Sequence, residues 1–334
     1  MNAPGGQLRA GDITPEVLAE RREPGSRGGV SAVSWLLVFI PFVVVFLLIG
    51  RYLIAGVVLA VTLLWALKDR KSKRLPLAPL AIFSVAGGLL IFFIILPILN
   101  LLFTTDPARV VSTALDPAVQ SALVITLSGA LIATLISLLF GIPLGYVLAR
   151  EQFAGKSVVE GIVDMPVVIP HTIAGIALLF IFGRGGILGA PLKTHFNVLL
   201  SDSYWGIVLA MLFVGLPFVV NHCRDGFLKV DPRMEHVARS LGANWLQAFF
   251  QVSIPLTRRD LLSGAIMTWA RAISEFGSVA IIAYYPKTIN TLLFEWYNFF
   301  GYTYTKPLSA LLLLVALAIF ISLRAVATLK RAEF

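Results

Sequence analysis

The sequence predicts an all-α integral membrane protein with about eight transmembrane helices. Two observations support this fold class. First, 58% of the 334 residues are hydrophobic and only 13% are charged, and the mean hydropathy of +0.87 is far above that of soluble globular domains. Second, the charged residues lie between long apolar runs, and a helix needs about 20 apolar residues to cross a bilayer.

Eight apolar segments predict the spans. They run over residues 32–49, 52–67, 77–103, 118–148, 159–182, 204–228, 261–283 and 307–328. The first two are short and are joined only by Gly50-Arg51, so we expect a helical hairpin. The third and fourth are longer than a bilayer requires, and we expect them to tilt or to protrude.

The distribution of Lys and Arg predicts the orientation. If the polar loop between the sixth and seventh spans is cytoplasmic and the spans alternate, 20 Lys and Arg residues lie on the inside and 6 on the outside. This imbalance satisfies the positive-inside rule and places both termini in the cytoplasm. The net charge of +9 is therefore mainly a topology signal, and we expect no nucleic-acid partner.

The chain is expected to contain three parts. Residues 1–31 are rich in Gly, Pro and Arg without apolar periodicity, which predicts a disordered cytoplasmic tail. Residues 32–74 comprise the hairpin and a basic cytoplasmic linker. Residues 75–330 form the main transmembrane domain, a multi-pass region of the cell (inner or plasma) membrane in contact with lipid, and residues 229–260 form a cytoplasmic loop within it.

The loop opens with clear signals for a short helix. Asp231 is suited to cap the helix, and Pro232 fits the first helical position, where its missing N–H is not needed. Glu235 lies in the first turn, where the helix dipole favours a negative charge. Gly242 is placed to end the helix in a left-handed conformation.

A second helix is predicted to follow directly. Asn244 and Gln247 have the spacing of a capping box, and Pro255 is expected to close the unit. Five apolar residues fall at the spacing of one helical face: Val237, Leu241, Trp245, Ala248 and Phe249. These features are typical of a docking surface and not of a catalytic site.

Motifs for catalysis and cofactor binding are missing from the sequence. It has no GxxxxGK[ST] phosphate loop, no HExxH, no DxDxDG and no GxSxG. Its four histidines are scattered, and Cys223 is the only cysteine. We therefore expect no enzymatic activity, no metal and no bound cofactor, and any ATP chemistry would belong to another subunit.

Ionisable residues within a predicted span are candidates for function. Arg271 and Glu275 are four residues apart in the seventh span and are expected to pair on one helix face. Ser274 and Ser278 add small polar groups beside them. These residues form either a gate in a translocation pathway or a self-neutralising pair that fixes helix packing.

Asp164 is the corresponding candidate in the fifth span. It lies close to Pro166, Pro170 and His171, and prolines in a span mark irregular backbone that lines a cavity or packs against protein. A residue of the pathway and a structural kink are both compatible with this pattern.

The 229–260 loop resembles the "EAA" loop of ABC importer permeases. That pattern is E-A-A, three residues, Gly, and a later Ile/Leu-Pro. Here it stands as Glu235-His236-Val237-Ala238-Arg239-Ser240-Leu241-Gly242, followed by Ile254-Pro255. Counted back from Gly242, the family's Glu falls on His236, and Glu235 lies one position earlier. The resemblance implies that Glu235, His236, Ala238, Leu241, Gly242, Ile254 and Pro255 belong to an ATPase-coupling loop.

Two further segments are similar to molybdate/tungstate permeases. They are DMPVVIPHTIAGIALL (residues 164–179) and ISEFGSVAIIAYYPKTINTLLFE (residues 273–295), and sulfate permeases share similar patterns. The resemblance implies a type I ABC importer permease core of six spans, to which the hairpin is an addition. It also implies a second permease copy, two ABC ATPase subunits that use ATP and Mg²⁺, and an external substrate-binding protein.

Alternatives to molybdate or tungstate import remain open at this stage. The nearest is a sulfate/thiosulfate ABC permease, because these substrates are also tetrahedral dianions. A different class, an ion-coupled secondary transporter, would require acidic residues at the midplane of the helix bundle, where the sequence offers only the self-paired Glu275.

Overall fold

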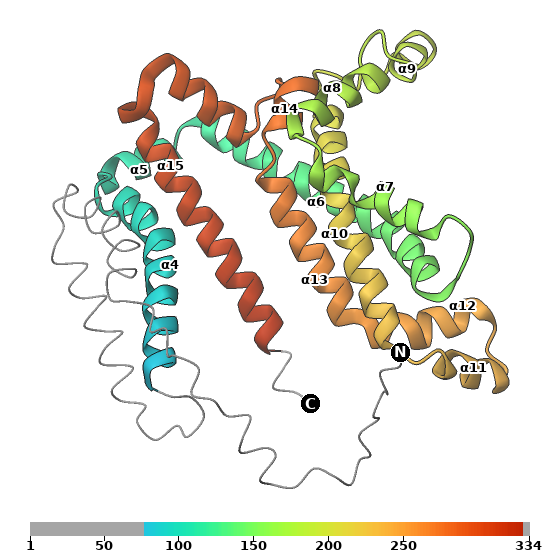
Figure 1. Ribbon diagram of the computed structural model, residues 1–334. Coiled ribbons are helices and arrows are strands. Elements are labelled where there is room, and N and C mark those ends of the chain that lie inside the picture. The colour runs from blue at the N-terminus through green and yellow to red at the C-terminus, as the bar shows by residue number, and fades with distance from the viewer. Residues whose placement is uncertain (1–76, 330–334) are drawn as a thin grey trace, which may run out of the picture. The chain divides into compact units, whose positions relative to one another are not determined.

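The computed structural model describes residues 77–329 (Figure 1). The chain divides into two compact units, Met1–Leu96 and Pro97–Phe334. The predicted tail at 1–31 and the predicted hairpin within 32–74 lie outside the described residues. The described part contains helices and no strands, which confirms the all-α class.

The helices follow one another with short connections. In chain order they are α4 (Leu77–Phe103), α5 (Pro107–Ala114), α6 (Pro117–Arg150), α7 (Lys156–Val168), α8 (His171–Phe182), α9 (Gly189–Phe196), α10 (Tyr204–Lys229), α11 (Arg233–Ser240), α12 (Trp245–Ala248), the π-helix η1 (Phe249–Ser253), α13 (Ile254–Ile273), α14 (Gly277–Ile282) and α15 (Ile289–Leu329). Within the described residues, four helices are long and apolar enough to cross a membrane: α4, α6, α10 and α15. A fifth span is present if α7 and α8 are counted together. The protein is therefore a multi-pass membrane protein, while a total of eight spans stays a prediction.

The fifth predicted span, 159–182, is bent and not straight. Helices α7 and α8 meet at an angle of 113°. The break lies at Ile169-Pro170, where Ile169 is extended, with φ −68° and ψ 133°. A residue that precedes proline is disfavoured in helical conformation, and proline has no N–H to continue the helix. Pro170 therefore bends the chain here, whereas Pro166 lies within α7.

The seventh predicted span, 261–283, is also divided. Helix α13 begins earlier, at Ile254, and ends at Ile273, and α14 begins at Gly277. The Asn290 side-chain amide donates hydrogen bonds to the carbonyl oxygens of Ile273 (2.8 Å) and Glu275 (3.1 Å). These bonds satisfy acceptors that a continuous helix would have bonded internally, so the break is stabilised by a side chain from α15.

The last predicted span, 307–328, lies within α15, which begins earlier than predicted and is kinked. Helix α15 begins at Ile289, so most of residues 284–306, between the seventh and eighth predicted spans, are helical. Gly301 interrupts the helix with φ 76° and ψ −178°. This left-handed region favours glycine, since a Cβ atom is unfavourable there. Figure 1 shows α15 sharply bent.

Helix α10 forms the centre of the packed bundle and contacts α6 and α13. Glycines allow the close approach: a Cβ atom added at Gly145 of α6 would lie 2.6 Å from the Cβ of Cys223 in α10. Across the other interface, Thr268 donates a hydrogen bond of 3.1 Å to the carbonyl oxygen of Gly215. These small-residue contacts are the packing mode expected between membrane helices. The segment α11–α12 lies at one end of α10 and α13, and α8 and α14 lie toward the other (Figure 1).

Candidate functional site

The first helix of the 229–260 loop ends at Gly242 as the sequence predicts, but it begins one residue later than predicted, at Arg233, with Pro232 at the N-cap. The Asp231 carboxylate accepts the Arg233 N–H at 2.9 Å. At the other end, Gly242 adopts φ 99°. Beside it, the N–H of Ala243 donates to the carbonyl oxygen of Ala238 at 3.1 Å. Together these bonds satisfy helix ends that would otherwise lack partners.

The second helix carries the predicted capping box but not the predicted end. Asn244 accepts the N–H of Gln247 at 2.8 Å, and Gln247 accepts the N–H of Asn244 at 2.7 Å. The chain then continues through η1 directly into α13. Ile254 and Pro255 are the first residues of α13, so Pro255 opens a helix and does not close the unit. The wider turn of the π-helix just before Pro255 tolerates the missing N–H.

The predicted single apolar face does not exist. Val237, Leu241 and Trp245 are exposed, with exposed fractions of 57%, 84% and 51%, whereas Ala248 and Phe249 are buried. Gly242 redirects the chain between the two helices, so the helical period cannot continue across it. The exposed apolar side chains instead lie on an open surface of the loop.

Glu235 is held inward by residues of α6. Its carboxylate accepts hydrogen bonds from Arg150 Nη2 (2.7 Å) and Nε (3.0 Å) and from the Tyr146 hydroxyl (2.6 Å). The Arg150 and Glu235 side chains are only 10% and 12% exposed. Arg150 also donates to the carbonyl oxygens of Phe227 (2.9 Å) and Val230 (3.0 Å) at the end of α10. We call Tyr146, Arg150 and Glu235 the anchor, because they tie α6, α10 and α11 together.

Electrostatics and aromatic packing both support the anchor. Burial alone would raise the pKa of the Glu235 carboxyl, but the hydrogen bonds from Tyr146 and Arg150 outweigh it, and the pKa lies below its ordinary value. The Tyr146 ring packs edge-to-face on Phe249, with ring centroids 4.9 Å apart. Trp245 stacks on Phe249 at 5.8 Å. The loop is thus fixed to the transmembrane helices at both of its short helices.

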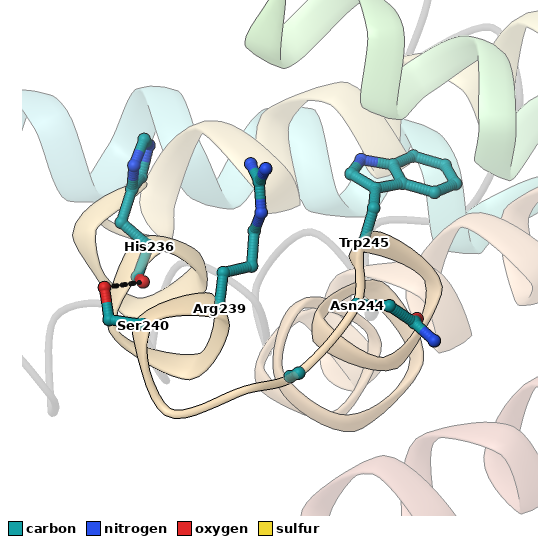
Figure 2. Close-up of a pocket in the computed structure, with 6 residues that line it drawn as sticks. His236, Arg239, Ser240, Asn244 and Trp245 are labelled. Atoms are coloured by element: carbon teal, nitrogen blue, oxygen red, sulfur yellow. Dashed lines mark hydrogen bonds between the residues drawn. The ribbon is translucent and has the colours of Figure 1, made fainter.

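The outward side of the loop is a shallow polar groove (Figure 2). It has a volume of about 470 Å³ and is lined by His236, Arg239, Ser240, Ala243, Asn244 and Trp245. Figure 2 shows the His236, Arg239 and Trp245 side chains pointing in the same direction. Glu235 faces the helices while its neighbour His236 faces the groove. The groove thus has basic and aromatic side chains and no acidic one.

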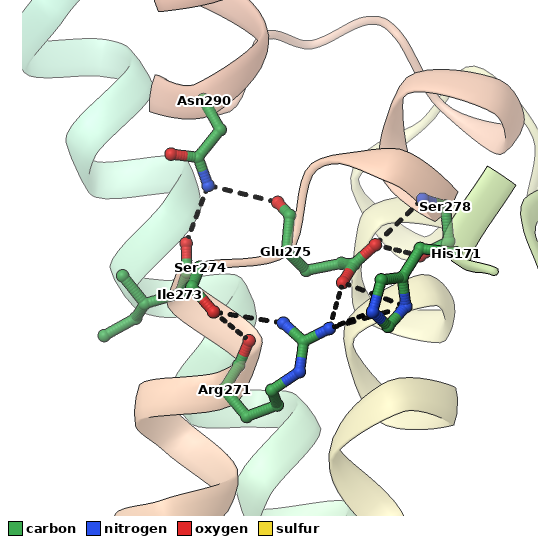
Figure 3. Close-up of polar contacts among 7 residues, drawn as sticks. All are labelled: His171, Arg271, Ile273, Ser274, Glu275, Ser278 and Asn290. Atoms are coloured by element: carbon green, nitrogen blue, oxygen red, sulfur yellow. Dashed lines mark hydrogen bonds and ion pairs between the residues drawn. The ribbon is translucent and has the colours of Figure 1, made fainter. Parts of the chain in front are cut away.

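The second group of candidates, at the break between α13 and α14, forms a compact cluster (Figure 3). Arg271 Nη2 lies 3.0 Å from Glu275 Oε2, so the predicted pair forms. Glu275 is 1% exposed, and its other oxygen accepts the N–H and the hydroxyl of Ser278, each at 2.8 Å. Arg271 Nη1 donates to the Ser274 hydroxyl at 3.0 Å. The expectation of a shared helix face is wrong, because the helix ends between Arg271 and Glu275.

His171 joins this cluster, which the sequence did not indicate. Its Nε2 lies 2.6 Å from Arg271 Nη2, and its Nδ1 lies 3.7 Å from Glu275 Oε2. His171 is the first residue of α8, so the two helix breaks meet here. We call His171, Arg271, Ser274, Glu275 and Ser278 the Arg271 cluster.

Asp164 lies outside this cluster. Its carboxylate accepts a hydrogen bond of 2.6 Å from the Asn221 side chain of α10. The contact links α7 to α10 and satisfies a carboxyl group that has no cationic partner among the described residues. Of the five residues considered for a pathway, four therefore come together and Asp164 does not.

A family model supplies the class of the protein. Residues 141–332 match the model described as "Binding-protein-dependent transport system inner membrane component". The chain belongs to this family. It is therefore an ABC importer permease, and the matched region includes both the 229–260 loop and the Arg271 cluster.

Similar curated proteins carry a more specific description. The permease is 48% identical over 248 residues to the molybdate/tungstate transport system permease protein WtpB of Pyrococcus abyssi, which covers 73% of this chain and 94% of that protein. It is 45% identical over 247 residues to the protein of the same name from Thermococcus kodakarensis, with 73% and 94% covered. A probable sulfate transport system permease protein from Marchantia polymorpha is 32% identical over 232 residues, with 67% of this chain and 80% of that protein covered.

The fold also has a counterpart among solved structures. A bacterial ABC transporter involved in the import of the acidic polysaccharide alginate matches with a TM-score of 0.54 and 16% identity, and the match covers 76% of this chain and 96% of that chain. At this identity the likeness concerns the fold alone. It agrees with the assignment to ABC importer permeases.

Proposed function

We propose that this permease forms the pathway of an ATP-driven importer for molybdate and tungstate. The observation that carries the proposal is the 48% identity to a protein named a molybdate/tungstate permease, over 94% of that protein's length. The identity falls to 32% for a protein named a sulfate permease. All three substrates are tetrahedral dianions, so sulfate is the nearest competing cargo.

Competition uptake tests the cargo. The permease is reconstituted in proteoliposomes with its ATPase and its binding protein, and uptake of labelled tungstate is measured with excess unlabelled molybdate or sulfate. We expect molybdate to suppress uptake and sulfate to leave it unchanged. Equal suppression by sulfate would favour a sulfate permease. Uptake that proceeds without ATP and follows an ion gradient would favour a secondary transporter.

We further propose that the 229–260 loop is the site at which the ATPase docks. Large apolar side chains are exposed on a loop that is too polar to lie in lipid: Met234, Val237, Leu241, Trp245 and Leu246 are each more than half exposed. An exposed apolar patch beside a polar groove is typical of a protein interface. The basic lining of the groove fits an ATPase surface that contributes a carboxylate. In this proposal the outward His236 makes the polar contact and the inward Glu235 supports the loop.

Co-purification tests the docking site. Leu241→Asp places a charge on the most exposed apolar side chain of the loop, and we expect the ATPase to be lost on purification. Leu115→Asp is the matched control, because Leu115 is 67% exposed but lies between α5 and α6, far from the loop in Figure 1. Retention of the ATPase by Leu241→Asp would contradict docking at this surface.

We infer that the assembled importer contains two permease copies, two ATPases that use ATP and Mg²⁺, and an external binding protein. The family description, which names a binding-protein-dependent system, supports the last partner. The excess of Lys and Arg on the loop side supports a cytoplasmic location for the loop and for both termini, in the plasma membrane. Native mass spectrometry of the complex tests the composition, and protease access to a C-terminal tag in sealed vesicles tests the orientation.

A further inference from the structure

In the Arg271 cluster the negative charge is buried and the positive charge is partly exposed. The Glu275 carboxylate is buried and is bonded on one oxygen by Ser278 and on the other by Arg271. The Arg271 and His171 side chains are 23% and 37% exposed, and Ser274 is exposed. The negative group therefore lies inside the protein, and the accessible surface presents a guanidinium, an imidazole and a hydroxyl.

Arg271 keeps donors available for a ligand. A guanidinium has five N–H donors in a rigid plane. The bonds to Ser274, His171 and Glu275 come only from Nη1 and Nη2. Within the described part of the chain, the Nε–H makes no hydrogen bond. A guanidinium that is positioned by a buried carboxylate and still has free donors is well suited to bind an oxyanion, because a hydrogen bond from a cation to an anionic oxygen is stronger than one between neutral groups.

The backbone at this site also favours the binding of an anion. Two helix breaks, at 169–170 and 274–276, meet at the cluster. A Cβ atom added at Gly277 would lie 2.8 Å from the Cβ of His171, so α8 and α14 begin in direct contact. In a membrane, irregular backbone is tolerated where protein covers it or where it lines a polar cavity. The first N–H groups of α8, a helix of 12 residues, add positive character beside the imidazole.

We propose that Arg271 is a contact site for the oxyanion on its way through the permease, and that His171 and Ser274 hold its guanidinium in place as hydrogen-bond acceptors. Glu275 is a positioning residue: it orients the guanidinium and lowers the positive charge of the site, which lets a dianion leave again. The identity of the anion rests on the proposed function. The location of the contact site rests on the cluster itself.

Cysteine labelling tests the electrostatics of the site. Ser274→Cys places a thiol beside Arg271, and the wild-type protein, whose Cys223 is buried, gives the background. We expect the anionic methanethiosulfonate ethylsulfonate to react faster than its trimethylammonium analogue by roughly tenfold or more. We also expect tungstate, molybdate or sulfate to slow the reaction. A thiol that is unreactive, or that prefers the cationic reagent, would overturn the proposal.

A variant that removes both charges distinguishes anion contact by Arg271 from a purely structural role. Arg271→Met combined with Glu275→Gln removes both charges without leaving an unpaired buried carboxylate, and the glutamine carbonyl can still accept the bonds from Ser278. In the Ser274→Cys background we expect the preference for the anionic reagent and the protection by anions to disappear, and uptake by the full complex to fall by roughly tenfold or more. Glu275→Gln alone keeps the guanidinium and should retain or increase the preference.

The outcomes distinguish the two proposals. If the double variant retains its ATPase and transports as well as the wild type, the pair fixes helix packing and the contact site is refuted. If the labelling behaves as expected but only sulfate is transported, the contact site stands and the molybdate/tungstate assignment fails.

Discussion

The anchor allows a quantitative prediction about the 229–260 loop. Glu235→Gln keeps the size of the side chain and an acceptor for Tyr146, but it removes the charge that Arg150 contacts through two N–H groups. Hydrogen bonds to charged groups contribute about 1.5–3 kcal/mol when solvent is largely excluded, and both side chains are nearly buried. We therefore expect the free energy of opening of α11 to fall by about 2 kcal/mol.

Hydrogen exchange measures this change directly. Since 1.36 kcal/mol corresponds to a factor of ten, the amides of α11 should exchange roughly 30-fold faster in Glu235→Gln. His236→Gln is the control: its side chain faces the groove, so exchange in the free permease should match the wild type, while affinity for the ATPase falls. If Glu235→Gln exchanges like the wild type and only loses the ATPase, Glu235 contacts the partner directly and the anchor is refuted.

Three further predictions follow from single residues. The pKa of Glu235 lies below its ordinary value of 4.5, so its pair with Arg150 stabilises the fold above that pH. This stabilisation is lost as the pH falls through the lower pKa of the folded state. The difference in melting temperature between wild type and Glu235→Gln should therefore be constant down to about pH 5 and shrink below about pH 4. The added methyl of Gly242→Ala meets no neighbouring atom but strains a left-handed residue, so we expect the stability of the permease to fall by about 1 kcal/mol. The bulkier Gly242→Trp should reduce the amount transported per ATP hydrolysed. A ratio equal to that of the wild type would count against docking at the loop. Gly145→Ala should destabilise the bundle by about 1–3 kcal/mol through overpacking at α10. Gly161→Ala adds a methyl group where nothing lies nearby, and it should stabilise the bundle by up to about 1 kcal/mol. The melting temperatures of the two variants in detergent measure the difference.

Local signals predicted the short helices of the 229–260 loop well, because caps depend on residues close in sequence. The end at Gly242 and the capping box of Asn244 and Gln247 are examples. The prediction of one apolar face from Val237 to Phe249 was wrong, because it assumed a single continuous helix. A helical period is informative only while the helix continues, and the left-handed Gly242 ends it.

Long-range contacts could not be predicted. Arg150 counted in the sequence only as one basic residue in the charge balance, although it binds Glu235, 85 residues away. His171 was one of four scattered histidines, and its place beside Arg271 depends on two helix breaks that meet in space. Asn290 stabilises one of those breaks from a third helix. Pairing of this kind follows from the fold and leaves no periodic signal along the chain.

The unbroken run of helix from Trp245 to Ile273 has a mechanical consequence. Helix α12, the π-helix and α13 follow one another without an intervening loop. At a rise of 1.5 Å per residue, the helical path from Trp245 in the groove to Arg271 is on the order of 40 Å long, and it changes direction between α12 and α13 (Figure 1). Because no loop interrupts this path, a movement at one end is expected to be transmitted to the other. Changes made at its two ends should therefore not act independently: the free-energy effects of a groove variant and an Arg271 variant on the transport cycle are expected to be non-additive despite their separation.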